Sequence, residues 1–242
     1  QRLLDGNVRD GETIRFFCNT DAPADWNSMK ELAGTYPQAV PFYGVHPWFS
    51  KDLGPGWQES LTRYAEAHGC GIGEIGLDAL KEPPLRRQKE VFVDQVELAC
   101  RLRRPFVLHC VRAWGEVMGV LHQYREKLPV FMVHAFGSSR ELMEELLGAG
   151  GYISFWLKDL ERRPEKIRPL LQAVPEERLL LETDFPNCRY DETSDIYTSY
   201  TECVERLYAA AAQLRGVDKE SLQRTVLNNG TVFTDTAASR ER

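Results

Sequence analysis

The sequence has no long apolar run, and none of its hydrophobic stretches approaches the roughly 18 residues that a membrane-spanning helix requires. It therefore predicts a soluble protein with no membrane partner. Positive charge is also scarce, because 30 Lys and Arg residues stand against 36 Asp and Glu residues, a net charge of −6. No general basic field would attract nucleic acid, which argues against tight binding to a duplex. A nuclease stays open, since metal ions neutralise a phosphodiester locally.

Cysteine pairs with a metal-binding or redox spacing are missing. The six cysteines are scattered, without a C-x-x-C motif and without a framework of disulfides. They indicate reduced thiols in a cytoplasmic protein. Internal repeats, low-complexity tracts and linker-like stretches are absent too, so we expect one domain over residues 1–242, as a monomer or a small homo-oligomer. This length is typical of a single (β/α)₈ barrel.

Short apolar runs alternate with amphipathic stretches from end to end. The runs are rich in Val, Ile, Leu and Phe, as expected for strands that are covered on both faces. Helical periodicity separates them, and Ser138 with Glu141 predicts a capping box at the start of one helix. This alternation predicts an α/β fold of parallel strands joined by right-handed crossovers. The seven runs are Thr13–Cys18, Val40–His46, Gly69–Gly76, Pro105–Cys110, Pro129–Ala135, Gly151–Phe155 and Arg178–Asp184.

Seven strands would fit an open doubly wound sheet, whereas a closed TIM barrel needs eight. The chain begins at Gln1 instead of Met and opens directly into residues that are typical of a loop. We therefore expect a (β/α)₈ TIM barrel whose first strand is missing from this chain, because one upstream strand would complete the barrel.

Metal-competent side chains recur at the carboxyl ends of the predicted strands: His46, Glu74, His109, His134 and Asp184. In a barrel these ends meet at one mouth, where active sites lie. Imidazole and carboxylate together suit Zn²⁺ and accommodate Mn²⁺ or other divalent ions. A single His at a strand end is more often a structural residue, and a single Asp often caps a helix. Five such residues at the same end of five strands favour a shared metal site.

Other polar residues fit structural roles better. His68 and His122 lie in predicted helices, His68 at a helix end where a cation suits the helix dipole. Lys158 and Arg189 follow strand ends, where contact with a substrate phosphate is a second interpretation beside a plain surface role.

Several segments between residues 13 and 235 together resemble the TatD family of metal-dependent deoxyribonucleases, which belongs to the amidohydrolase-like barrels. Asn228 with Phe233 is similar to the closing Asn-(x)₄-Phe signature of that family. The other segments, in chain order, are Gly44-Val45-His46-Pro47, Gly73-Glu74-Ile75-Gly76-Leu77-Asp78, Leu108-His109-Cys110, Val133-His134-Ala135-Phe136-Gly137-Ser138 and Leu181-Glu182-Thr183-Asp184.

The resemblance implies two divalent ions, Zn²⁺, Mg²⁺ or Mn²⁺, with Glu74 as the catalytic carboxylate that bridges them. It implies His109 and His134 as ligands of one ion. Asp184 would be a ligand of the other ion and would also orient or deprotonate the attacking water. His46 would contact the substrate phosphate. The His-x-His pair of the family's first strand is missing from this chain, so we expect one of the two metal sites to be incomplete.

The function expected from the sequence is metal-dependent hydrolysis of phosphodiester bonds by an activated water, in DNA or in a small phosphodiester. Two alternatives stay open. The same metal centre would also suit a hydrolase of a small ester, lactone or amide, because the barrel fold alone does not determine the substrate. A barrel that has lost one metal site would instead be catalytically impaired and serve a binding role.

Overall fold

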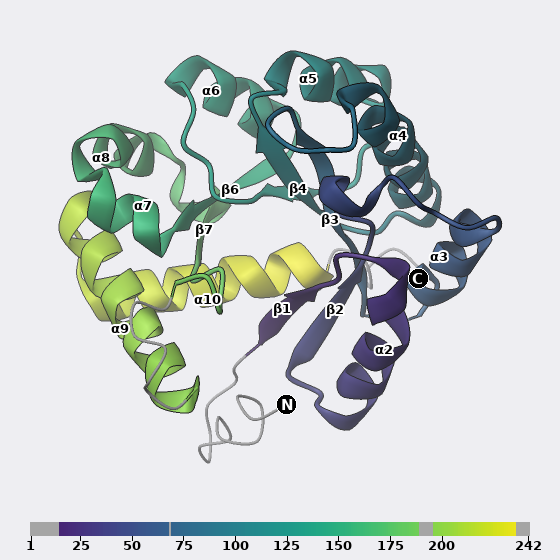
Figure 1. Cartoon of the computed structure of the whole chain (residues 1–242). Coiled ribbons are helices and arrows are strands. Elements are labelled where there is room, and N and C mark those ends of the chain that lie inside the picture. The colour runs from purple at the N-terminus through teal and green to yellow at the C-terminus, as the bar shows by residue number, and fades with distance from the viewer. Residues whose placement is uncertain (1–14, 68, 189–195, 236–242) are drawn as a thin grey trace. The chain divides into compact units, whose positions relative to one another are not determined.

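The computed structural model describes residues 15–67, 69–188 and 196–235 (Figure 1). Within these ranges the chain forms the predicted number of strands: β1 (Phe16–Asn19), β2 (Ala39–Tyr43), β3 (Gly71–Asp78), β4 (Phe106–Val111), β5 (Phe131–Val133), β6 (Gly151–Trp156) and β7 (Leu179–Glu182). The α-helices are α2 (Trp26–Thr35), α3 (Trp57–Ala65), α4 (Leu85–Leu102), α5 (Trp114–Gln123), α6 (Arg140–Gly148), α7 (Leu157–Arg162), α8 (Pro164–Ala173), α9 (Ile196–Arg215) and α10 (Lys219–Asp235). Short 3₁₀ helices are η1 (Pro23–Asp25), η2 (Pro47–Phe49) and η3 (Glu176–Arg178).

The described residues fall into two compact units. The first unit contains residues 15–133 and 233–235, with strands β1 to β5. The second unit contains residues 134–188 and 196–232, with strands β6 and β7. The single domain over residues 1–242 stays a prediction. In the described parts of both units, no helix has the length and apolar character needed to cross a membrane.

In the first unit each strand pairs in parallel with the next strand along the chain, from β1 to β5. The registers place Phe42 beside Gly71, and Phe106 beside Ile72 on one side and Phe131 on the other. Helices α2 to α5 make the crossovers and lie on the same side of these strands (Figure 1). Because the strands run in one direction, the carboxyl ends of β2, β3 and β4 share one edge of the sheet.

Aromatic packing closes the core of the first unit. The Phe17 ring lies 5.5 Å from the Phe42 ring and 5.7 Å from the Phe233 ring, and Phe42 and Phe233 stack nearly parallel. Phe233, the Phe of the predicted closing signature, is fully buried. Asn228 of that signature is exposed, whereas the neighbouring Asn229 is buried in the second unit and donates hydrogen bonds to two backbone carbonyls. The asparagine that is buried and hydrogen-bonded is thus Asn229 and not Asn228.

The second unit is built on the parallel pair β6 and β7, whose register runs from Ile153 beside Leu179 to Trp156 beside Glu182. Helices α7, α8 and α9 pack against one another. Arg206 of α9 binds Glu161 in the bidentate geometry that suits a guanidinium: Nε donates to Oε1 at 2.9 Å and Nη2 donates to Oε2 at 2.6 Å.

The observed elements differ from the predicted ones mainly at their ends. The predicted strand Pro129–Ala135 is reduced to three residues, so His134 follows β5 instead of ending it. The predicted capping box of Ser138 and Glu141 is wrong by one residue, because the chain stays extended through Ser139. The Ser139 hydroxyl accepts the hydrogen bond from the Leu142 N–H and caps α6. Residues 13 and 14 of the first predicted strand lie outside the described residues, as does His68.

Candidate metal centre

The first unit brings three predicted site residues to the carboxyl edge of its sheet. His46 follows β2, Glu74 lies in β3 and His109 lies in β4. The register that aligns the last two strands pairs Gly76 with His109. A Cβ atom at Gly76, where φ is +151°, would lie 1.9 Å from the backbone oxygen of His109. Only glycine therefore permits this close approach of β3 to β4.

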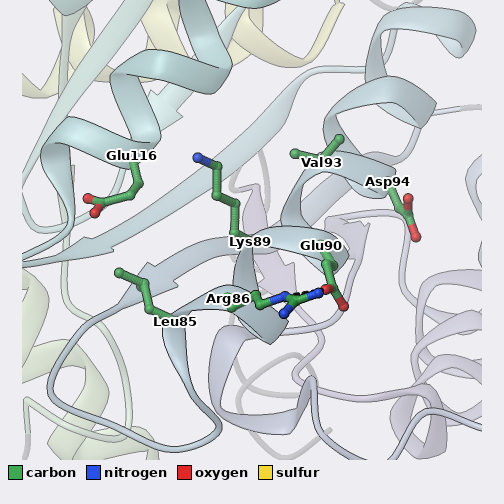
Figure 2. A pocket seen from close by; sticks show the side chains of 7 residues that line it. All are labelled: Leu85, Arg86, Lys89, Glu90, Val93, Asp94 and Glu116. Atoms are coloured by element: carbon green, nitrogen blue, oxygen red, sulfur yellow. Dashed lines mark ion pairs between the residues drawn. The ribbon is translucent and has the colours of Figure 1, made fainter.

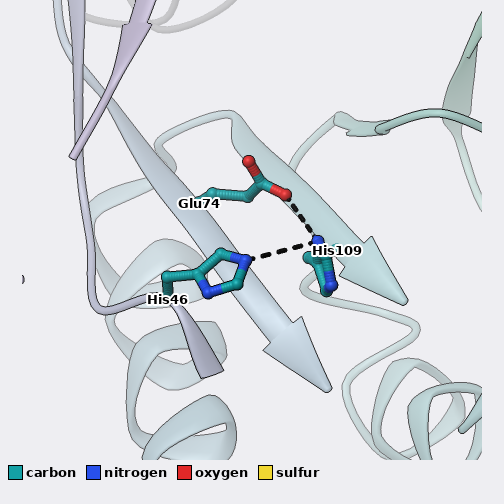
Figure 3. Close-up of side chains that lie close together, drawn as sticks. All are labelled: His46, Glu74 and His109. Atoms are coloured by element: carbon teal, nitrogen blue, oxygen red, sulfur yellow. Dashed lines mark hydrogen bonds and ion pairs between the residues drawn. The ribbon is translucent and has the colours of Figure 1, made fainter. Parts of the chain in front are cut away.

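The side chains of His46, Glu74 and His109 converge (Figure 3). His109 Nδ1 lies 2.8 Å from Glu74 Oε1 and 3.4 Å from His46 Nε2. The Glu74 and His109 side chains are each 12 % exposed, so the cluster is largely shielded from bulk water. Two ligands bound at ordinary Zn–N and Zn–O distances to a tetrahedral ion lie about 3.3 Å apart. The spacing and the chemistry of these donor atoms fit a divalent cation.

Protons at the cluster give a second test of that fit. The Trp48 N–H donates to His46 Nδ1 at 3.3 Å, so in the neutral ring of His46 the proton is on Nε2. This Nε2–H points at His109 Nδ1, which also faces the Glu74 carboxylate. One ring nitrogen cannot accept from His46 and donate to Glu74 at once. A cation between Glu74 and His109 resolves the Glu74 side of this conflict, because both atoms then donate lone pairs to the ion. The single lone pair of His109 Nδ1 is then no longer available to the His46 N–H.

Asp78 extends the cluster, although the sequence predicts no role for it in metal or substrate binding. Asp78 Oδ2 lies 3.8 Å from His109 Nε2 and accepts a hydrogen bond from the Trp48 indole at 2.7 Å. Its Oδ1 accepts from the Leu80 N–H at 2.8 Å. A usable signal was present, because Asp78 is four residues after Glu74 on one strand and therefore points to the same face.

The second unit holds His134 and Asp184, and a carboxylate fixes the orientation of the His134 ring. His134 Nδ1 lies 3.0 Å from Glu182 Oε1, which also accepts the Ala135 N–H at 2.5 Å. Since Nδ1 donates to this carboxylate, Nε2 carries the lone pair of the ring. This is the carboxylate–histidine arrangement that commonly supports a metal-binding imidazole. Glu182 was also given no role from the sequence, although it is two residues before Asp184.

Asp184 lies in a turn that follows β7. Its φ is +51°, its carbonyl accepts the Asn187 N–H at 2.7 Å, and its carboxylate accepts the Asn187 side-chain amide at 3.2 Å. The structure thus brings His46, Glu74 and His109 together in one unit and describes His134 and Asp184 in the other. Their convergence on a common ion stays a prediction.

Two residues were considered for contact with a substrate phosphate. The Lys158 ammonium lies 5.3 Å from the centroid of the Trp156 ring, a cation–π contact within the second unit. Arg189 lies outside the described residues.

A separate groove of about 660 Å³ lies along α4 and α5 (Figure 2). An ion pair joins two of its lining residues, Arg86 and Glu90. Its lining has no histidine, cysteine or serine, and it lies apart from the His46, Glu74 and His109 cluster. The lining residues are Leu85, Arg86, Lys89, Glu90, Val93, Asp94 and Glu116.

Known relatives share sequence with much of this chain. The 3'-5' ssDNA/RNA exonuclease TatD of Escherichia fergusonii is 35% identical over 161 residues, which are 65% of this chain and 62% of the relative. The enzyme of the same name from Klebsiella pneumoniae is 36% identical over 171 residues, 69% of this chain and 64% of the relative. The matched part of the chain thus spans less than two thirds of the length of these relatives.

Solved structures share the fold. The TatD homologue YJJV from Escherichia coli K12 has a TM-score of 0.80 at 23% identity, covering 91% of this chain and 86% of that chain. A TatD family hydrolase from Entamoeba histolytica has a TM-score of 0.77 at 19% identity, covering 90% of this chain and 83% of that one. The predicted α/β fold of the barrel type is confirmed by these likenesses. The family model described as TatD related DNase matches residues 4–233, and the chain therefore belongs to that family.

Proposed function

We propose that this chain is a divalent-metal-dependent nuclease that hydrolyses phosphodiester bonds in single-stranded nucleic acid. One observation carries the proposal: a carboxylate and two imidazoles meet, nearly buried, at the carboxyl ends of three neighbouring parallel strands. Active sites of α/β barrels lie at this edge, and Glu74 with His109 supplies donors that suit a hydrolytic metal ion. The relatives named as exonucleases add support from sequence.

Each residue has a distinct proposed role. Glu74 and His109 would hold a metal ion in the first unit. His134 and Asp184 keep the metal-ligand roles predicted from the sequence. Glu182 keeps the His134 ring in the tautomer whose Nε2 binds metal. A bound divalent ion supplies Lewis-acid activation of water and offsets charge on the phosphate. Asp184 is the general base that takes the proton of the attacking water.

His46 is proposed to bind substrate. Because its Nδ1 accepts from the Trp48 N–H, its Nε2–H is a donor in the neutral ring. A donor beside a metal site suits a phosphate oxygen, whereas metal ligation needs a lone pair. We therefore assign His46 to the phosphate and not to the ion.

Nucleic acid is favoured over a small ester by the surface next to His46. Trp48 and Phe49 follow it in η2 and are 46% and 47% exposed. The Lys81 ammonium lies 5.1 Å from the centroid of the Trp48 ring. Exposed aromatic rings with a nearby cation are typical of surfaces that stack the bases of single strands and bind their backbone. This local surface compensates for the acidic overall charge of the chain.

The test uses the full chain, stripped of metal and reloaded with Mg²⁺, Mn²⁺ or Zn²⁺. Substrates are an end-labelled single-stranded DNA oligonucleotide, bis(p-nitrophenyl) phosphate, and a panel of small esters, lactones and amides. We expect metal-dependent shortening of the oligonucleotide. Glu74→Gln should lose this cleavage, because an amide is a poor metal ligand. Lys166→Ala, at an exposed position of α8, should keep it. Turnover of the small esters with no cleavage of DNA would overturn the proposal, as would full activity of Glu74→Gln.

A further inference from the structure

We propose that Gln88 and Gln95 of α4 are positioning residues that set the geometry of the metal centre without touching metal or substrate. Each clamps the backbone of one residue at the carboxyl edge of the sheet. Gln95 acts through Val45 on His46, and Gln88 acts through Asp78 on His109. The inference about catalysis rests on the proposed function, whereas the inference about geometry does not.

Gln95 holds the residue that precedes His46. Its Oε1 accepts the Val45 N–H at 2.7 Å, and its Nε2 donates to the Val45 carbonyl at 3.1 Å. A neighbouring strand would offer the same donor and acceptor to an extended residue. The His46 N–H in turn donates to the Asp21 carbonyl at 2.8 Å. The backbone on which the His46 ring is mounted is therefore fixed at two successive residues.

Gln88 holds the end of β3 in the same way. Its Oε1 accepts the Asp78 N–H at 2.7 Å, and its Nε2 donates to the Asp78 carbonyl at 2.9 Å. The same amide nitrogen lies within hydrogen-bond distance of the carbonyls of Lys81 and Pro83, which follow in the loop. Asp78 is the residue whose carboxylate faces His109 and accepts from the Trp48 indole. Fixing its backbone fixes that carboxylate.

The spacing of the two glutamines along α4 suits two such clamps. Seven residues are close to two helical turns, so both side chains leave α4 on one face and lie about 10 Å apart along its axis. Both are only 1% exposed, among the apolar side chains that α4 packs against the sheet. A buried amide without partners is unfavourable, and here the hydrogen bonds of both amides go to backbone groups, among them those of Val45 and Asp78 at the site.

The chemistry requires an amide. A carboxamide presents one acceptor and two donors, which match a backbone N–H and carbonyl pair. Glutamate keeps the acceptor and loses the donor when it is ionised, whereas methionine keeps the length but loses both. The series Gln, Glu and Met at position 95 therefore removes the clamp one hydrogen bond at a time while the volume changes little.

The first measurement needs neither metal nor substrate. The chain has five histidines, so the ¹⁵N resonances of their rings are few enough to assign with single His replacements. In the parent chain we expect His46 to be the Nε2–H tautomer. Gln95→Met should release the turn that presents the Trp48 N–H to His46 Nδ1, and a mixture of tautomers should appear at His46. The tautomer ratio of His122, at an exposed position of α5, should not change.

The second measurement is kinetic, on the metal-loaded chain well below its melting temperature. For Gln95→Met and Gln88→Met we expect kcat on single-stranded DNA to fall about 10- to 100-fold, with KM changed much less, because misplaced groups cost rate more than binding. Gln95→Glu should fall between the parent and Gln95→Met. Gln123→Met, at an exposed position of α5, is the matched control and should match the parent.

The outcomes separate the two hypotheses. A variant that melts earlier but keeps both the His46 tautomer and kcat would show a purely structural glutamine and overturn the inference. If Gln95→Met does not fold, Gln95→Leu, which also lacks both hydrogen-bonding groups, carries the same comparison, and an unchanged tautomer and kcat there would also overturn it. A parent chain without nuclease activity refutes the proposed function, but the tautomer measurement still decides whether Gln95 positions His46.

Discussion

Two histidines of this chain lie about 3 Å from a glutamate, and the two pairs are built differently. Glu74 faces His109 at 2.8 Å with His46 beside it, and both histidines can bind metal or substrate. Glu182 faces His134 at 3.0 Å, but it also accepts the backbone N–H of Ala135. The first carboxylate therefore suits a ligand, and the second suits a support that orients a ligand. The same pair of residue types serves two purposes according to its other contacts.

The sharpest test of this difference compares the two glutamates directly. Glu74→Ala should abolish metal-dependent turnover, because a carboxylate ligand of the candidate metal centre is lost. Glu182→Ala should lower metal affinity or activity about 10- to 100-fold, the usual cost of removing a supporting carboxylate. Calorimetric titration with Mn²⁺ and the DNA assay measure both. Equal losses for the two variants would contradict the assigned difference.

The reactivity of two cysteines, one in each unit, tests whether a thiolate is available there as a further metal ligand. Burial raises the pKa of Cys110 in the first unit to about 12. In the second unit, burial and then contact with Cys203 raise the pKa of Cys188 to about 12. An ordinary thiol near pKa 9 is about one tenth ionised at pH 8, so these two should be alkylated about 1000-fold more slowly.

Their reactivity should rise only as the pH approaches 12, because the thiolate is the reactive form. Mass spectrometry of peptides after iodoacetamide treatment measures the rate at each cysteine, and the urea-unfolded chain is the control. Rapid labelling of Cys110 in the native chain would indicate a thiolate beside the metal centre. Cys110 would then have to be considered as a further metal ligand.

Gly76 tests how strongly the first site depends on the approach of β3 to β4. Gly76→Ala should lower the free energy of unfolding by about 3 kcal/mol or more, because the new Cβ meets the His109 backbone. Gly115→Ala in α5 is the matched control. No atom lies near the added methyl there, and alanine favours a helix by about 0.5–1 kcal/mol. Urea unfolding measures both, and a Gly76→Ala chain as stable as the parent would contradict so close a contact between the two strands.

The smallest expected effect concerns the exposed aromatic surface beside His46. Phe49→Ala should raise KM for single-stranded DNA about tenfold, since one stacked base is worth about 1–3 kcal/mol. The same variant should change bis(p-nitrophenyl) phosphate turnover much less, because that substrate carries only two small nitrophenyl rings and no strand of bases to stack along the surface. A similar loss on both substrates would mean that Phe49 supports the cluster itself and not the nucleic acid.

The strand order and the meeting of His46, Glu74 and His109 were predictable from the sequence, because parallel strands carry their terminal residues to one edge. The ends of helices and strands were harder to predict. Ser138 and Ser139 are adjacent and of the same type, so the sequence does not tell which of them caps α6. Glu182 was overlooked because its role depends on His134, which is 48 residues away. Gln88 and Gln95 were harder still, since a polar residue within an amphipathic helix ordinarily faces water.

Trp48 connects the parts of the first site. Its indole N–H is bonded to Asp78, its backbone N–H to His46, and its ring centre lies 6.4 Å from that of His109. Because the ring is also half exposed, its emission will respond both to a paramagnetic ion at the cluster and to a base laid against it. The protein thus carries its own optical probe for loading of the centre, one that Trp48→Phe would silence while the other four tryptophans stay.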